Sequence, residues 1–272
     1  MLYLLFYLTY TSDYNIICYN LNSMQTPIII ANLKCNPSNI KELFKLQDST
    51  WNKLNKEKYK YYLATPNIFL RELAKEKYKA FDIGTQNIDK VEDGAYTGEI
   101  SLSQALDAEV KFCILGHSEV RARGETSLEI SKKVNETLRA NLPTVLCVGE
   151  RSRTLETYLD EIKNMLVASL QNIDRRYVES LVIAYEPLWA IGASRAATVD
   201  DCLEATIQIR RTLVDLFGIS NAKKIKVLYG GSVDEVNAAS FIRLGGVDGV
   251  LVGRASLDAD KFATIVNSIY EI

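Results

Sequence analysis

Residues 112–119 read Phe-Cys-Ile-Leu-Gly-His-Ser-Glu, and both the fold and the chemistry can be predicted outward from them. Four apolar residues in succession are typical of a buried strand. Gly116 ends the apolar run, and the polar residues after it indicate a turn toward a helix. His117 is the only histidine of the chain, and it is predicted to emerge where a buried strand ends.

A second ionisable group is placed in the same way. Residues 181–185, Leu-Val-Ile-Ala-Tyr, form another apolar run, and Glu186 follows it directly. Pro187 has no backbone N–H to donate, so the strand is not expected to continue. A carboxylate and an imidazole at the carboxyl ends of two different strands indicate acid–base chemistry on an α/β fold.

Short apolar runs alternate with longer amphipathic segments from Pro27 to the C-terminus. The predicted strands are Ile28–Leu33, Tyr59–Ala64, Ala80–Gln86, Lys111–Leu115, Pro143–Val148, Leu181–Tyr185, Ile225–Tyr229 and Gly249–Val252. The predicted helical segments include Asn39–Leu54, Leu128–Leu138, Thr154–Leu170, Asp201–Leu216 and Val233–Leu244. Eight strand–helix units without a break in composition favour one closed parallel (β/α)8 TIM barrel over two domains. Right-handed crossovers would place the carboxyl ends of all strands on one rim.

Composition narrows the classes of partner and compartment. The 272 residues include 32 basic and 34 acidic side chains and no long basic block, so we expect neither nucleic acid nor a membrane as a partner. The cysteines show no CxxC spacing, which favours free thiols in a reducing, cytoplasmic compartment and gives no reason to expect zinc or another metal. These cysteines are Cys18, Cys35, Cys113, Cys147 and Cys202.

The first residues differ from the rest of the chain. Residues 1–8 are apolar, but no lysine or arginine precedes Lys34 and no cleavage site of small residues follows. The run is also shorter than the ~20 residues that span a bilayer. Three interpretations stay open for residues 1–23: an extension outside the native domain or without structure, a docked arm, and a targeting segment. We expect one catalytic barrel over residues 24–272, beginning at Met24.

Polar and glycine residues follow the predicted strands. They are Asn32 and Lys34 after the first strand, His117 and Glu119 after the fourth, Glu186 after the sixth, Gly230, Gly231 and Ser232 after the seventh, and Gly253 after the eighth. A carboxylate can remove a carbon-bound proton beside a carbonyl only if donors stabilise the enediolate that forms. His117, Lys34 and Asn32 are candidates for those donors.

Two glycine-containing turns suggest a phosphate site. In residues 229–232 and 252–256, glycine allows backbone N–H groups to approach an oxyanion closely. Barrels often bind phosphate at the loops after their seventh and eighth strands. Either turn alone is more often a simple tight connection. In this order, however, they predict a small phosphate ester as the substrate.

Several segments resemble the triosephosphate isomerase family, in the order in which that family has them. The segments are Asn32–Lys34, Ala95–Ser101, Ile114–Glu119, Cys147–Glu150, Ala184–Gly192, Tyr229–Ser232 and Asp248–Gly253. The resemblance covers essentially everything from Ile28 to the C-terminus, and the sequences AYEPLWAIG and GHSE are its most specific parts.

The resemblance implies a cofactor-independent isomerase of glycolysis and gluconeogenesis. It would interconvert dihydroxyacetone phosphate and glyceraldehyde 3-phosphate through an enediolate. Glu186 would be the base, and His117 would be a neutral electrophile, a property for which this family is itself a standard example. Lys34 would offset developing negative charge, Asn32 would orient donors, and Glu119 would support Lys34 or His117.

The resemblance also implies a lid, a phosphate site and a second subunit. The lid would comprise Pro187–Ala197, including Trp189, Ala190, Ile191 and Gly192. The backbone of Gly192 would bind the phosphate of the substrate, together with the backbone of Ser232, Gly253 and Arg254. The hydroxyl of Tyr229 would latch the closed lid. Thr97 would reach the active site of a neighbouring subunit, so that a homodimer is expected.

The chain departs from the common family pattern at a few positions. Leu33 stands where tryptophan is usual, and Val120 where arginine often follows. Residues 193–195, Ala-Ser-Arg, replace a Thr-Gly-Lys type of lid tip. Arg254 replaces a glycine, and its side chain would make a positive φ costly there.

Other interpretations of these residues were weighed. His117 could be an ordinary polar residue, Glu186 a member of a structural ion pair, and Lys34 a solvated lysine. Thr97 could be an ordinary turn residue and Trp189 a packing residue, whereas Glu150 and Cys147 are interpreted as structural. Two rival functions are a barrel aldolase that forms a Schiff base through Lys34, and a catalytically silent barrel that binds sugar phosphates or a protein.

Overall fold

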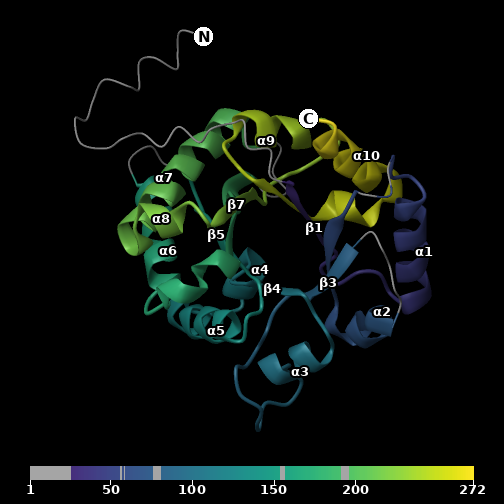
Figure 1. Cartoon of the computed structure of the whole chain (residues 1–272), viewed down its shortest axis with the longest axis horizontal. Coiled ribbons are helices and arrows are strands. Elements are labelled where there is room, and N and C mark those ends of the chain that lie inside the picture. Colours follow the sequence, from purple (N-terminus) through teal and green to yellow (C-terminus); the bar gives the residue numbers. More distant parts are fainter. Residues whose placement is uncertain (1–25, 56, 58, 76–80, 154–156, 191–195) are drawn as a thin grey trace.

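The computed structural model describes residues 26–55, 57, 59–75, 81–153, 157–190 and 196–272. Over this part of the chain, eight parallel strands close into a barrel with helices around its outside (Figure 1). The strands are β1 (Ile28–Asn32), β2 (Tyr61–Thr65), β3 (Phe81–Thr85), β4 (Phe112–Leu115), β5 (Thr144–Val148), β6 (Leu181–Tyr185), β7 (Lys226–Tyr229) and β8 (Gly249–Val252). The predicted (β/α)8 TIM barrel is confirmed. The predicted extension, residues 1–23, lies outside the described residues.

The helices follow the strands in sequence order. They are α1 (Ile40–Trp51), α2 (Leu70–Lys75), α3 (Leu102–Asp107), α4 (Ser118–Arg121), α5 (Ser127–Arg139), α6 (Tyr158–Ser169), α7 (Val199–Phe217), α8 (Ile219–Ala222), α9 (Ala238–Leu244) and α10 (Ala259–Tyr270). Hydrophobic periodicity predicted the long helices α1, α5, α6 and α7 to within a few residues at each end. Helix α9 is five residues shorter at its start than the predicted Val233–Leu244 segment, because residues 233–237 form a turn stabilised by Asp234 and Asn237.

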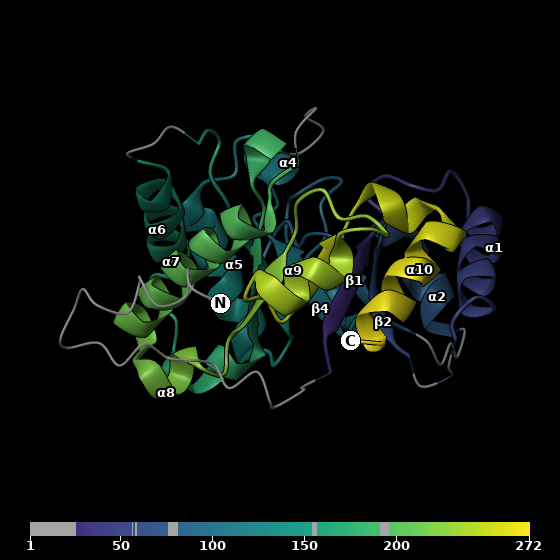
Figure 2. The same cartoon turned by 90° about the horizontal axis from the view of Figure 1, so that it is seen from above.

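The ring of strands closes where β1 pairs with β8. Ile30 of β1 is level with Tyr62 of β2 on one side and with Leu251 of β8 on the other. The surrounding helices close in the same way, since α10 packs against α1 (Figure 2). Lys53 Nζ lies 2.5 Å from Asp260 Oδ1 at this junction. The first and last strand–helix units are therefore joined both in the ring of strands and in the ring of helices.

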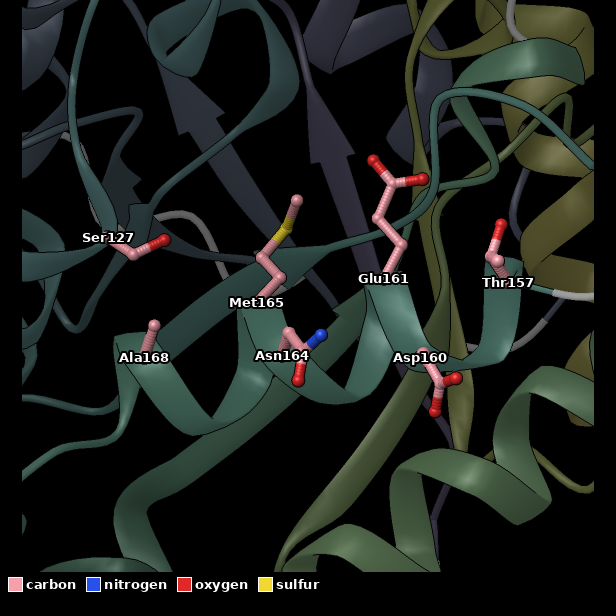
Figure 3. Close-up of a pocket in the computed structure, with 7 residues that line it drawn as sticks. All are labelled: Ser127, Thr157, Asp160, Glu161, Asn164, Met165 and Ala168. Carbon is pink, nitrogen blue, oxygen red and sulfur yellow. The ribbon is translucent and has the colours of Figure 1, made fainter.

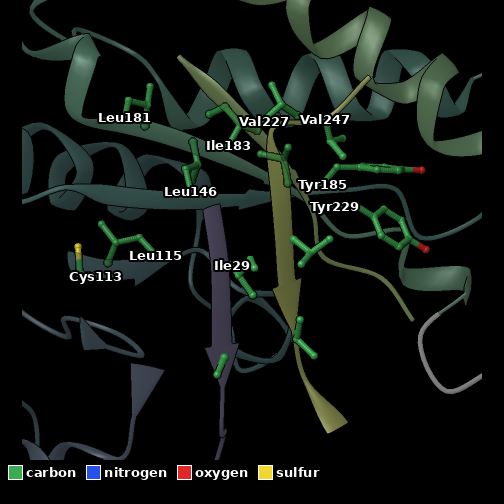
Figure 4. Packing of buried hydrophobic residues seen from close by; sticks show 14 of the residues in the cluster. Ile29, Cys113, Leu115, Leu146, Leu181, Ile183, Tyr185, Val227, Tyr229 and Val247 are labelled. Atoms are coloured by element: carbon green, nitrogen blue, oxygen red, sulfur yellow. The ribbon is translucent and has the colours of Figure 1, made fainter. Parts of the chain in front are cut away.

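Alternation along the strands separates two hydrophobic clusters. Ile29 of β1 belongs to the large cluster that fills the space between strands and helices, part of which is shown in Figure 4. Ile30 belongs to a smaller cluster in the barrel interior, with side chains from the other strands such as Ile114 of β4 and Leu228 of β7. Successive side chains of a strand point to opposite faces, so every strand except β3 supplies both clusters. On β3 the alternate positions are Asp82 and Gly84, and its apolar side chains belong to the large cluster.

The same alternation determines which polar side chains can face the barrel axis. Asn32 continues the inward row of Ile28 and Ile30 on β1. Glu186 continues the inward row of Val182 and Ala184 on β6. Both polar side chains are therefore directed to the centre of the rim by the register of the strands that carry them. None of the described helices has the length and apolar character needed to cross a bilayer.

Candidate active site

His117 and Glu186 meet at the carboxyl ends of β4 and β6. His117 Nε2 lies 3.2 Å from Glu186 Oε1, although the residues come from different quarters of the chain. Both residues are nearly inaccessible, with exposed fractions of 7% and 2%. The structure therefore brings together the two groups that the sequence singled out.

The backbone of Gly116 directs His117 toward the barrel axis. Gly116 has a φ of +67°, in the left-handed region that favours glycine. The strand alternation is broken at this residue, and the chain turns into α4 directly after His117. The N–H of Ser118 then donates to Glu186 Oε2 at 3.1 Å, so the carboxylate is held from both His117 and the residue after it.

The hydrogen bonds of the imidazole define its protonation. The N–H of Glu119 donates to His117 Nδ1 at 3.2 Å. A ring nitrogen that accepts a hydrogen bond carries no proton, so the hydrogen of the neutral ring is on Nε2 and faces Glu186. In this tautomer, Nε2 is the ring nitrogen that can donate a hydrogen bond.

Lys34 completes the polar cluster from the end of β1. Its Nζ lies 2.6 Å from Glu119 Oε1. The backbone N–H of Lys34 donates to Asn32 Oδ1 at 3.1 Å. The φ of Lys34 is +53°, which is unusual for a residue with a side chain. Of the two partners expected for Glu119, Lys34 is the one that its carboxylate bonds directly, because His117 Nδ1 is 3.9 Å from the other carboxylate oxygen and is bonded by the backbone N–H of Glu119.

Charges around Glu119 favour its ionised form. Burial alone would raise the pKa of the carboxyl group, but the hydrogen bond and charge of Lys34, with smaller effects from His117 and Arg123, hold the pKa below its ordinary value. The site therefore contains a carboxylate paired with an ammonium group beside His117.

Gln86 is a site residue that the sequence analysis did not select. Its Nε2 donates to the carbonyl of Lys34 at 2.8 Å and to the carbonyl of Ala64 at 3.1 Å. The unusual backbone of Lys34 is thus held on one side by Asn32 and on the other by Gln86. A signal was present, because Gln86 is a polar residue directly after β3, as Asn32 and Glu186 are polar residues at the ends of β1 and β6.

The two glycine-containing turns lie next to this cluster. A Cβ at Gly230 would be 3.2 Å from Glu186 Cγ, and a Cβ at Gly253 would be 3.7 Å from Lys34 Cε. Arg254 is not among the described residues with positive φ, so the strain anticipated for its side chain does not arise. The predicted phosphate-binding backbone of Gly253 and Arg254 is therefore adjacent to Lys34.

The beginning of the predicted lid contacts the seventh-strand turn. Ser232 Oγ donates to the carbonyl of Ala190 at 3.0 Å, within the short 3-10 turn Leu188–Ala190 that follows Pro187. Ala197, at the other end of the predicted lid, is buried. Ile191, Gly192 and the lid tip at residues 193–195 lie outside the described residues.

Two buried polar groups accompany the lid segment. Glu150 is fully buried, and its Oε1 accepts hydrogen bonds from Trp189 Nε1 at 2.6 Å and from Tyr185 Oη at 2.9 Å. The Trp189 side chain therefore makes a hydrogen bond in addition to its packing contacts. The Tyr229 ring is stacked on Phe241, and its buried hydroxyl has no hydrogen-bond partner among the described residues.

Thr97 lies apart from the site of its own chain. Residues 92–99 are all exposed, and together with α3 they project from the edge of the barrel in Figure 1. Lys90 spans the base of this loop, with its Nζ 3.3 Å from Glu99 Oε2 and 5.0 Å from the centre of the Tyr96 ring. The loop has internal contacts, but its tip contributes nothing to the cluster around His117.

Two surface pockets differ in whether predicted site residues line them. The larger, about 600 Å³, lies on the outside between α6 and Ser127 at the start of α5 (Figure 3). None of the predicted site residues lines it. The smaller, about 340 Å³, is lined by Glu186, Ser118, Gly149 and Arg121 among others. The chemistry is therefore associated with the smaller cavity.

A closed (β/α)8 barrel with a carboxylate, a neutral imidazole and an ion-paired lysine at its strand ends defines a barrel enzyme of the acid–base class. The family model described as triosephosphate isomerase matches residues 27–269 of the chain. The chain therefore belongs to the triosephosphate isomerase family, and it is an isomerase that interconverts dihydroxyacetone phosphate and glyceraldehyde 3-phosphate.

Curated relatives match over most of their length. The triosephosphate isomerase of Alkaliphilus oremlandii is 34% identical over 248 residues, which are 90% of this chain and 100% of that protein. The triosephosphate isomerase of Mycoplasma capricolum is 36% identical over 247 residues, or 90% and 99% of the two chains. That of Carboxydothermus hydrogenoformans is 41% identical over 189 residues, or 68% and 74%.

Proposed function

We propose that Glu186 is the base of this isomerase and that His117 is its electrophile. One observation carries the proposal: the protonated Nε2 of a neutral imidazole lies 3.2 Å from a buried carboxylate oxygen. A base and a hydrogen-bond donor this close together can act on adjacent atoms of one small substrate.

In the proposed reaction, the carboxylate of Glu186 removes a proton from the carbon beside the carbonyl of dihydroxyacetone phosphate. The electron pair of the C–H bond forms a carbon–carbon double bond, and the π pair of the carbonyl moves to its oxygen, which takes the proton of the His117 Nε2–H. Nε2 then takes the proton of the neighbouring hydroxyl group, whose oxygen becomes the aldehyde carbonyl. The proton held by Glu186 returns to the carbon that carried the original carbonyl. The single Nε2–H cannot donate to Glu186 and to the substrate carbonyl at the same time. The substrate carbonyl therefore takes the place of Glu186 Oε1, and the carboxylate shifts toward the substrate carbon.

Lys34, Asn32 and Glu119 prepare the site for negative charge. Lys34 supplies a positive charge near the oxygens of the enediolate, where preorganised charges stabilise a transition state most effectively. Asn32 and Glu119 hold its backbone and its ammonium group, respectively. An ammonium group in an ion pair has no free lone pair, so this geometry disfavours the Schiff base of an aldolase mechanism.

The backbone N–H groups of Ser232, Gly253 and Arg254 are assigned to the phosphate, with Gly192 joining them from the lid. The positions of Gly253 next to Lys34 and of Gly230 next to Glu186 support this assignment. Closure over Pro187–Ala197 would exclude water from the enediolate, and the unpartnered hydroxyl of Tyr229 is available as the latch.

A homodimer in the cytoplasm is the assembly and location we assign. The projecting residues 92–99 expose Tyr96 and Thr97, and an exposed loop that is held at its base can enter a pocket of a second copy. Four cysteines of the described chain are free thiols, as suits a reducing compartment. A mass of twice 30.6 kDa by light scattering would support the dimer, and a monomeric enzyme with full activity would contradict it.

The test of the catalytic pair is a coupled assay on Glu186→Gln and on His117→Gln. Each change removes one proton-transfer group and should lower kcat by about 10³-fold. Circular dichroism of each variant should show that the fold is retained. Retained turnover in Glu186→Gln would remove Glu186 from its role. Borohydride trapping of substrate on Lys34 would instead support the aldolase, and binding of a triose phosphate without isomerisation would support the silent barrel.

A further inference from the structure

Arg121, at the end of α4, is a half-buried cation whose hydrogen bonds all go to neutral atoms. Its Nε donates to the carbonyl of Gly116 at 2.8 Å, and its Nη1 donates to Ser127 Oγ at 3.0 Å. Its Nη2 donates to the carbonyl of Cys147 at 3.2 Å and to Ser169 Oγ at 3.1 Å. No carboxylate among the described residues is within ion-pair distance of it. A partly buried charge usually has a partner of opposite sign, so this arrangement calls for an explanation.

Two of the four bonds end on strand-end carbonyls of the catalytic rim. Gly116 is the residue before His117, and Cys147 is on β5, where the next residue, Val148, accepts from the N–H of Glu186 at 2.8 Å. A Cβ at Gly116 would be 2.9 Å from Arg121 Nη2. The guanidinium therefore lies directly behind the turn that orients His117 and behind the strand that supports Glu186.

Arg121 and Glu186 also line the same cavity of about 340 Å³. The other charged or titratable groups around the Glu186 carboxylate are His117, Lys34, Cys147 and Arg151 at the cavity mouth. His117 is neutral, Lys34 is paired with Glu119, and burial followed by the charge of Glu186 raises the pKa of the Cys147 thiol, which keeps it neutral. Arg151 is exposed to solvent, which screens its charge.

The nearby carboxylates do not explain the position of Arg121. Burial lowers the pKa of its guanidinium, so its charge is not stabilised by burial alone. Glu125 is ion-paired with Lys133 within the described chain, and the carboxylate of Glu186 contacts His117 and the N–H of Ser118. The guanidinium is therefore held by its bonds to two carbonyls of the rim and two serine hydroxyls.

We propose that Arg121 is a positioning residue of the isomerase, which fixes the carbonyls of Gly116 and Cys147 so that His117 faces the base. Arg121 does not touch the substrate, since its donors are directed to the backbone and to two serines. The proposal rests on the proposed role of Glu186 as the base. A guanidinium suits this position because its planar fork can reach two carbonyls at once, which an ammonium group cannot do with the same geometry.

Two substitutions test whether Arg121 positions His117. Arg121→Met removes the donors at similar size, and kcat should fall by about 10²-fold because the catalytic groups are misplaced. Arg121→Lys keeps a cationic donor that cannot reach both carbonyls with the same geometry, so kcat should fall by only about 10-fold. KM should change little in either variant, because the phosphate contacts lie elsewhere.

Ser127→Ala is the matched control, because it removes one partner of Arg121 and keeps the charge and both carbonyl bonds. It should leave kcat and KM unchanged. Parental kcat in folded Arg121→Met would overturn the proposal, and so would a loss of kcat/KM that comes from KM alone. If Arg121→Met does not fold, Arg121→Lys decides, and parental kcat in that variant would also overturn the proposal. Glu186→Gln measured in parallel separates the failures: its activity would refute the base, whereas an inactive Glu186→Gln beside a fully active Arg121→Met would refute only the role of Arg121.

Discussion

Lys34 Nζ lies 2.6 Å from Glu119 Oε1, and the two residues are 85 positions apart in the sequence. The ion pair joins the end of β1 to the first turn of α4, directly beside His117. Without this contact a lysine side chain at the rim would sample many rotamers, and fixing it would cost conformational entropy when the substrate binds. The pair therefore holds the positive charge in place before the substrate arrives.

Glu119→Gln should therefore weaken catalysis through Lys34. The amide keeps the size of the side chain but loses the ion pair, so kcat/KM should fall by about 10-fold in a coupled assay, within the range for a charged hydrogen bond. Because the pKa of Glu119 is held low, the pair is complete above the ordinary carboxyl range and is lost as pH falls through the lowered value. A variant that equals the parent at pH 7 would show that Glu119 has no part in placing Lys34.

Glu186→Asp should withdraw the base from the substrate. One methylene fewer moves the carboxylate back by about 1 Å, and a displacement of this size typically costs on the order of 10² in turnover. Binding of the phosphate should be almost unchanged, because its contacts are on other strand ends. Steady-state kinetics with circular dichroism as the control for folding are sufficient, and unchanged kcat would exclude Glu186 as the base.

The sequence predicted the parts of this structure that depend on local pattern. The apolar runs marked all eight strands to within about two residues, because a strand buried on both faces must be apolar throughout. Asn32 and Glu186 could be placed at the rim since each directly continues a strand. His117 could be placed for the same reason, because it follows β4 after a single glycine.

The network around these residues was not predictable, because it depends on side chains that meet only after the barrel has closed. Gln86 was missed although it follows β3, since its contact is with the backbone of Lys34 and not with a reacting atom. Glu150 was assigned a structural role, and only the folded chain shows that its carboxylate joins Trp189 to Tyr185. No periodicity in a sequence encodes such contacts across loops.

Residues 1–23 should be dispensable for catalysis. The family match begins at residue 27, and β1 begins at Ile28, so the barrel needs no residue before them for its strand pairs. A chain that starts at Met24 should remain in solution as a dimer with the kcat of the full chain. Size-exclusion chromatography and the coupled assay check this, and aggregation of the shortened chain would show that the extension is part of the fold.

Glu150 should make the stability of the protein fall as pH rises above the ordinary carboxyl range. Burial raises its pKa, and the hydrogen bonds from Trp189, its own backbone and Tyr185, with the charge of Arg153, only partly offset this. Between its ordinary value of 4.5 and the raised value, the native state holds a proton that the unfolded state has lost. Because the native state binds more protons than the unfolded state, the free energy of unfolding decreases as pH rises over this interval. Above the raised pKa, the contribution of Glu150 to stability is lost.

Glu150→Gln removes the titration and keeps the acceptor. The amide oxygen can still accept from Trp189 and Tyr185, and the amide nitrogen replaces Oε2, which has no partner among the described residues. The urea midpoint of the variant should therefore change less than that of the parent from pH 4.5 toward neutral pH. Glu161→Gln, a change of a partly buried carboxylate on α6, is the control and should keep the parental slope. Equal slopes in the parent and in Glu150→Gln would mean that the buried carboxyl group does not control this dependence.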